Sequence, residues 1–151
     1  GFAAAVMRRV GKGVIVHLCT DIFSQYKQLG DPQMLRWLRE IVELMDPKPM
    51  FRTDAPSWVD VSLRRQGNRL LVHLVNQNPG RDVARLGSDD TWVDEIPEIG
   101  PIACDIRCDR KPAAVTLEPG GLALRFRWEK GVLAAAVPKL HIHACVSVLW
   151  R

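Results

Sequence analysis

Two histidines near the end of the chain have the spacing of a metal-binding pair. His141 and His143 form an H-x-H motif, and residues two apart in a strand project from the same face. Cys145 follows on that predicted face, and imidazole and thiolate are ligands that zinc accepts. The sequence offers no evident third carboxylate or fourth ligand, and the polar outer face of a strand explains the motif equally well. His141 and His143 are therefore metal candidates, while we expect no bound metal and no cofactor.

Asp21 and Tyr26 are the polar residues best placed for ligand binding in the first part of the chain. Both follow the apolar run Lys12–Thr20, which predicts a strand. Ligands of α/β sheets bind beyond the carboxyl ends of the strands. Capping of a loop by Asp21 and packing of Tyr26 are the structural alternatives. No nucleophile is paired with a base near them, so we assign no catalytic residue.

Exposed tryptophans could stack against a sugar ring. Trp58 and Trp92 are the candidates for such substrate binding. Trp128 falls on the inward positions of a predicted strand, so we expect it in the core.

The acidic pairs of the chain fit catalysis poorly. Asp89-Asp90 and Asp94-Glu95 could suggest glycoside hydrolysis. They fall in a predicted loop, however, and catalytic carboxylates need rigid elements that fix their separation. No serine lies in a G-x-S-x-G elbow, and no cysteine has the surroundings of a reactive nucleophile.

The composition predicts a globular protein with a substantial core. The 151 residues are 47% hydrophobic and 25% charged, and no apolar run approaches the ~20 residues of a membrane helix. The net charge of +4 is spread along the chain, so we expect neither a nucleic-acid partner nor a membrane partner. Four cysteines without a C-x-x-C motif favour a reducing, cytoplasmic location.

The first segment predicts one strand and one helix. Lys12–Thr20 is a nearly continuous apolar run, typical of a strand buried on both faces in a parallel or mixed sheet. Asp31 and Pro32 predict the start of a helix, which should end at Asp46-Pro47. One strand and one helix do not make a domain. Residues 1–47 therefore resemble the remnant of a larger α/β domain, and we expect them to expose apolar surface or to cover it with a partner.

From residue 48 to residue 151 the pattern changes to period two, which predicts an antiparallel β-sandwich and a mainly β fold. A long irregular crossover is expected over Gln77–Pro101. The alternation points Leu122, Leu124, Phe126 and Trp128 inward along one strand, and Ile142, Ala144, Val146 and Val148 inward along the last. The predicted strands are Trp58–Leu63, Asn68–Asn76, Ile102–Cys108, Ala114–Glu118, Leu122–Trp128, Val132–Val137 and His141–Leu149.

The order of these segments resembles a known family. G-K-G-V-I-V-H-L, a turn with Tyr26, and Gly30-Asp31-Pro32 before the helix are similar to the end of a glutamine-amidotransferase-like α/β domain. In bacterial glycoside hydrolases resembling the family 42 β-galactosidases, that domain follows the catalytic barrel and is called the trimerisation domain. Ala55-Pro56, V-D-V-S-L-R-R-Q-G-N-R-L-L-V-H-L-V-N and Pro138–His143 resemble the small β-sandwich that follows it.

The resemblance implies a chain without chemistry of its own. The catalytic glutamates of that family belong to the barrel, and its amidotransferase-like domain normally lacks the cysteine-histidine machinery. We therefore expect a fragment that is the non-catalytic C-terminal accessory part of a glycoside-hydrolase-like protein. Its partner would be an upstream catalytic domain or an oligomer partner. The alternative is a stand-alone carbohydrate-binding β-sandwich, and turnover of galactosides by this chain is not expected.

Overall fold

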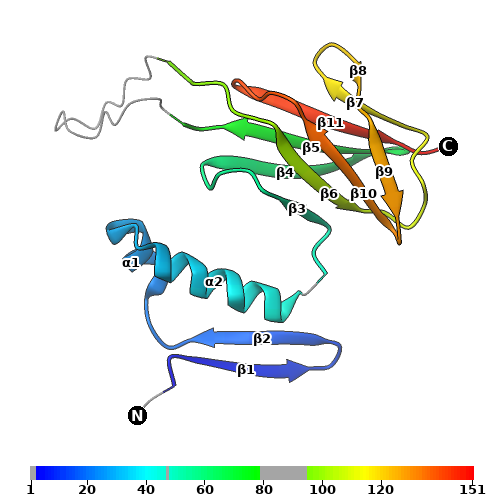
Figure 1. The fold of residues 1–151 in the computed structure, drawn as a ribbon. Helices are drawn as coiled ribbons and strands as arrows, with labels where there is room; N and C mark the ends of the chain where they lie inside the picture. The colour runs from blue at the N-terminus through cyan, green and yellow to red at the C-terminus, as the bar shows by residue number, and fades with distance from the viewer. Residues whose placement is uncertain (1–2, 47, 79–94) are drawn as a thin grey trace. The chain divides into compact units, whose positions relative to one another are not determined.

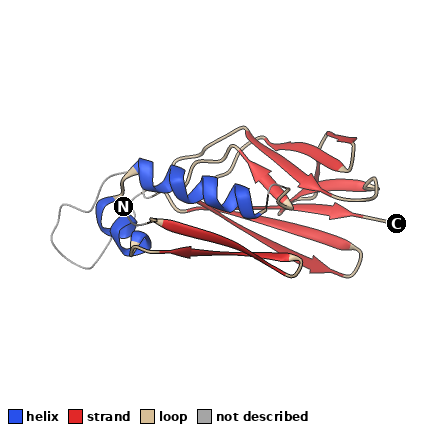
Figure 2. Cartoon of the chain, turned by 90° about the horizontal axis from the view of Figure 1, so that it is seen from below, coloured by secondary structure: helices blue, strands red, loops and turns tan. Residues whose placement is uncertain are grey.

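The computed structural model describes residues 3–46, 48–78 and 95–151 (Figure 1). The chain divides into two compact units, Gly1–Pro49 and Met50–Arg151. Both described helices belong to the first unit, and the second is built from strands (Figure 2).

The first unit begins with a β-hairpin. β1 (Ala5–Val10) pairs antiparallel with β2 (Gly13–Leu18), and Ala5 lies opposite Leu18. Gly11 makes the turn with a φ of 57°, which a side chain would disfavour. The prediction of a strand buried on both faces of a parallel or mixed sheet is wrong, because β2 alternates between half-buried and exposed residues. β1, the antiparallel partner of β2, was not recognised as a strand because it contains two arginines.

Two helices follow the hairpin, where the sequence predicted one. α1 (Ile22–Leu29) ends at Gly30, whose φ is 63°. α2 (Pro32–Met45) begins and ends as predicted, with the Asp31 side chain accepting a hydrogen bond of 2.8 Å from the backbone N–H of Gln33. The unit is therefore a hairpin followed by two helices. α1 was missed because four of its eight residues are polar and the segment was interpreted as a turn.

The second unit is an antiparallel β-sandwich, as predicted. Every neighbouring pair of its strands is antiparallel. One described sheet has the order β3 (Phe51–Thr53), β6 (Ile102–Arg107), β10 (Val132–Val137), β9 (Phe126–Glu129). The other has the order β4 (Val59–Gln66), β5 (Arg69–Asn76), β11 (His143–Leu149), β7 (Ala114–Glu118), β8 (Leu122–Ala123).

The core of the sandwich lies between these two sheets. Its fully buried side chains include Val72 and Val146 from one sheet and Ile106 and Leu133 from the other. Every second residue of each strand points into this core. That alternation is why the sequence pattern located most strands correctly.

Two parts of the predicted alternation are wrong. Leu122–Trp128 is not one strand, because β8 pairs with β7 in one sheet and β9 pairs with β10 in the other. The chain changes sheets between them, and Leu122 is 54% exposed. Ile142 is 53% exposed because β11 begins only at His143, whereas Ala144, Val146 and Val148 are buried as predicted.

Candidate functional site

Uncovered apolar surface is the main feature of the first unit. Within its described residues, Ile22 is the one buried hydrophobic side chain, and α2 buries none of its residues. Nine large hydrophobic residues of the unit are exposed: Val6, Met7, Val10, Ile15, Phe23, Leu29, Val42, Leu44 and Met45. Such a surface on a small unit marks an interaction site.

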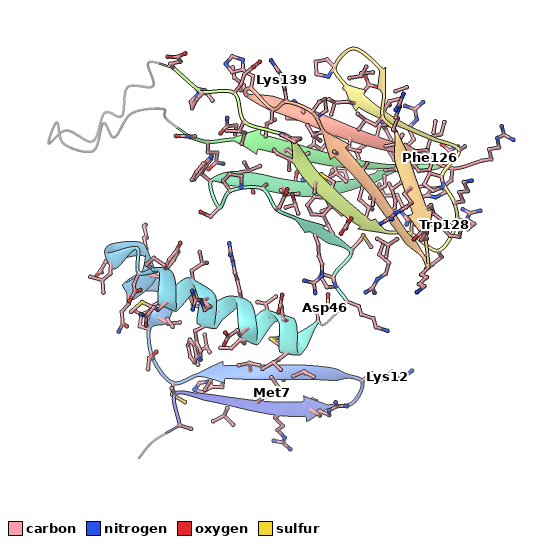
Figure 3. The ribbon with its side chains drawn as sticks, in the orientation of Figure 1. Met7, Lys12, Asp46, Phe126, Trp128 and Lys139 are labelled. Atoms are coloured by element: carbon pink, nitrogen blue, oxygen red, sulfur yellow. The ribbon has the colours of Figure 1, made fainter. Side chains whose placement is uncertain are left out.

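The register of the hairpin gathers three of these residues on one face. Val6, Val10 and Ile15 share this face, which we call the hairpin face, and are 50%, 52% and 57% exposed. The opposite face of β2 is half-buried, and α2 contacts β2 within the unit. Lys12 lies at the tip of the hairpin (Figure 3).

A hairpin of this kind is weakly stable by itself. A two-stranded sheet is marginal in water, and both of its edges present unpaired backbone groups. About half of each side chain of the hairpin face is open to solvent. Covering it would contribute roughly 1 kcal/mol per side chain. The hairpin face is therefore the best candidate for a protein interface in this unit.

The first two candidate ligand-binding residues have structural roles. The carboxylate of Asp21 caps α1 by accepting a hydrogen bond of 3.4 Å from the backbone N–H of Ser24. Tyr26 is half-buried within α1, and its carbonyl accepts a hydrogen bond of 2.8 Å from Gly30. These contacts correspond to the capping and packing alternatives, and neither pairs a nucleophile with a base.

The structure separates His141 from His143 and joins His143 to another histidine. His141 lies in the bend before β11, so the two do not share a strand face. Nε2 of His143 lies 3.1 Å from Nδ1 of His73 on β5. Their rings are stacked with centroids 5.4 Å apart and an angle of 17°. His73 was missed because a pairing between distant strands leaves no spacing signal.

This histidine pair lies on the outer face of the five-stranded sheet, opposite the core. In the register, Cys145 lies opposite His73 on one side and opposite Glu118 on the other. Both carboxylate oxygens of Glu118 are engaged, one by the Thr116 hydroxyl at 3.0 Å and one by the Gly121 N–H at 2.9 Å. No group of three or more His, Cys, Asp or Glu among the described residues is placed to hold a metal ion.

The buried cysteines are unsuited to nucleophilic or metal chemistry. Burial raises the pKa of the Cys145 thiol, and the Glu118 carboxylate raises it further. Burial also raises the pKa of Cys108, and it raises that of Cys104 to about 11. A thiol with a raised pKa stays protonated and unreactive near neutral pH. Cys104 and Cys108 are buried in the core, and all four cysteines are free thiols.

The tryptophan candidates differ in their surroundings. Trp58 is 44% exposed just before β4, while Trp92 lies outside the described residues. Trp128, on β9 (Figure 3), packs against the core as predicted, and its indole N–H donates a 3.2 Å hydrogen bond to the carbonyl of Cys108. Trp58 thus remains the described candidate for stacking on a sugar.

None of the described helices is long and apolar enough to cross a membrane.

Comparison with solved structures gives likenesses of fold. The α-L-fucosidase isoenzyme 2 from Paenibacillus thiaminolyticus matches 96% of this chain with a TM-score of 0.79 and 17% identity. The matched part is 22% of the fucosidase, so this chain spans about a fifth of that protein. At this identity the likeness establishes the architecture.

A second match is weaker. A cycloisomaltooligosaccharide glucanotransferase from Paenibacillus sp., solved with cycloisomaltoheptaose, covers 65% of this chain with a TM-score of 0.46 and 16% identity, over 16% of its own length. No protein-family model matches the sequence, and no curated protein matches it.

Proposed function

We propose that this chain is the non-catalytic C-terminal accessory part of a glycoside-hydrolase-like protein, supporting a catalytic barrel or an oligomer interface. The observation that carries the proposal is the contrast between the two units. The described residues of the sandwich share one extensive buried core, while the described part of the first unit buries a single hydrophobic side chain. A unit that cannot bury its own apolar residues gains stability when another surface covers them.

We assign the hairpin face to the missing part of its own domain. The sequence of the hairpin and α2 resembles the end of the amidotransferase-like trimerisation domain of proteins similar to the family 42 β-galactosidases. Further strands of such a domain would pair with a hairpin edge and cover Val6, Val10 and Ile15. The fucosidase supports this assignment, because the stretch that matches this chain belongs there to a much longer polypeptide.

The candidate residues support a role without chemistry. Asp21 caps a helix, and Tyr26 packs within it. In the proposed protein the reaction takes place in the barrel, and this chain contributes stability and assembly.

The test is reconstitution. The chain is co-expressed with the polypeptide encoded directly upstream of Gly1, and co-purification is measured. We expect a stable complex with the unaltered chain and at least tenfold weaker association with Ile15→Asp. Leu122→Asp is the matched control, because Leu122 is 54% exposed but lies on the sandwich. Failure to associate, with the chain remaining a stable monomer, would count decisively against the proposal.

A carbohydrate-binding module is the second candidate, favoured by the exposed indole of Trp58. It predicts binding on a glycan array and loss of that binding with Trp58→Ala. An array without hits, or binding that is unchanged in the variant, would remove this candidate.

A further inference from the structure

A basic cleft lies at the end of the sandwich where β11 finishes. It is lined by the segment between β6 and β7 and by the residues that follow β11, and its volume is about 440 Å³. The C-terminal end of β11 can be followed in Figure 1. The lining residues are Arg110, Lys111, Pro112, Ala113, Trp150 and Arg151.

Trp150 forms a fixed wall of this basic cleft. Its indole N–H donates a 3.0 Å hydrogen bond to the Arg110 carbonyl. Its backbone N–H donates to the carbonyl of Asn68 at 3.0 Å, and the Asn68 amide donates back to the Trp150 carbonyl at 2.7 Å. Part of the ring packs against the core. The wall is therefore in place before any ligand arrives, which lowers the entropy lost on binding.

A backbone contact fixes the other side of the cleft. The N–H of Ala113 donates a 2.8 Å hydrogen bond to the carbonyl of Leu149. This bond ties the segment between β6 and β7 to the end of β11. The loop that lines the cleft is thus held to the end of a sheet strand.

Three cations line the cleft without a partner in the part of the chain that the structure describes. Arg110, Lys111 and Arg151 are exposed, and none of their side chains forms a hydrogen bond or an ion pair with another described residue. Like charges held near one another repel, and an anion between them relieves that repulsion. The electrostatics of the cleft therefore favour a negatively charged ligand.

We propose that this cleft binds an anionic saccharide, a sugar that carries a carboxylate or a sulfate group. Guanidinium and ammonium groups form short, charge-assisted hydrogen bonds to such anions. The indole of Trp150 offers an apolar surface to the C–H face of a sugar ring. The volume falls within the range of about 300–1,000 Å³ typical of small-molecule sites. This inference does not depend on the accessory role proposed above.

Calorimetric titration of the 151-residue chain tests the proposal. The probes are a trigalacturonate, a sulfated disaccharide, the neutral counterpart of each, and inorganic sulfate. We expect at least one of the two anionic saccharides to bind at least tenfold more tightly than its neutral counterpart and than sulfate alone. Binding should weaken as sodium chloride rises, since salt screens the charges.

Variants separate the cleft from general surface charge. Arg110→Gln and Lys111→Gln should each weaken binding about fivefold to tenfold, which corresponds to roughly 1–1.4 kcal/mol. Lys139→Gln is the control, because Lys139 precedes β11 while the cleft follows it (Figure 3). Circular dichroism confirms that each variant is folded.

Four results would overturn the proposal. The first is that neither anionic saccharide binds at 10 mM, about the limit of a weak site. The second and third are that the neutral sugars, or inorganic sulfate, bind as tightly as the anionic saccharides. The fourth is that Lys139→Gln weakens binding as much as the cleft variants do. The sulfate result would reduce the cleft to a simple anion site.

Discussion

Nδ1 of His73 and Nε2 of His143 lie 3.1 Å apart across β5 and β11, although 70 residues separate them in the chain. The histidine contact therefore joins two neighbouring strands, whereas the H-x-H motif suggested a pair within one strand. A hydrogen bond between two imidazoles needs one ring to donate and the other to accept. His141, the neighbour that the spacing suggested, has no part in it.

The histidine pair predicts a measurable coupling. His73→Ala and His143→Ala should each lower the free energy of unfolding by about 0.5–1.5 kcal/mol, because each removes the same hydrogen bond. The double variant should lose less than the sum, and urea denaturation measures all three. His141→Ala is the control and should leave stability unchanged. Additive losses, or an equal loss in the control, would contradict the pairing.

The stability of the sandwich should fall at alkaline pH. Burial raises the pKa of Cys104 from 9.0 to about 11, so the folded state favours the neutral thiol. Its contribution is complete below pH 9 and is lost as pH rises through 11, by up to about 2–3 kcal/mol. Unfolding of the wild type and of Cys104→Ala is measured from pH 8 to pH 11. The variant should show a shallower decline, and identical slopes would refute the assignment.

Asn76 holds the backbone at Pro97 and at Asn78 from inside the sandwich. It is 2% exposed, and its side chain donates to the carbonyl of Pro97 at 2.9 Å and accepts from the N–H of Asn78 at 3.1 Å. Asn76→Ala should cost about 1–3 kcal/mol, because the two backbone partners lose their hydrogen bonds. Thermal unfolding checks this. Gln77→Ala, at an exposed neighbouring position, should be nearly neutral, and equal effects would argue against the buried network.

Gly100 should tolerate no side chain. Its φ is 146°, and an added Cβ would lie 2.5 Å from the backbone oxygen of Pro138. Gly100→Ala should therefore cost roughly 2–4 kcal/mol. Gly67 has a φ of 55° but open space around it, so Gly67→Ala should cost only about 1 kcal/mol. Chemical denaturation compares the two, and a Gly100→Ala protein as stable as Gly67→Ala would contradict the close approach.

The sandwich was largely predictable from sequence because burial imposes a period of two on each strand. Prediction from this period of two failed where the alternation of residue types did not come from burial in a single strand. The alternation from Leu122 to Trp128 continues through a change of sheet, and Ile142 keeps the period although it precedes its strand.

The candidate sites were less predictable than the fold. The His73–His143 contact and the basic cleft bring together residues from distant segments, so neither leaves a local motif. β1 was hidden by Arg8 and Arg9, which are both exposed, Arg8 on the hairpin face opposite Ile15 and Arg9 on the other face. For Asp21, sequence alone could not distinguish a helix cap from a ligand-binding residue, because both roles place a carboxylate just after a strand.

Hydrogen exchange of the isolated 151-residue chain tests the central claim most directly. If the first unit needs covering, the amides of β1 and β2 should exchange at least a hundredfold faster than those of β5 and β11, which flank the core. Adding the upstream polypeptide should then slow exchange in the hairpin. Hairpin amides as well protected as the core strands, in a chain that sedimentation shows to be monomeric, would contradict the claim that this unit is completed by another part of a larger protein.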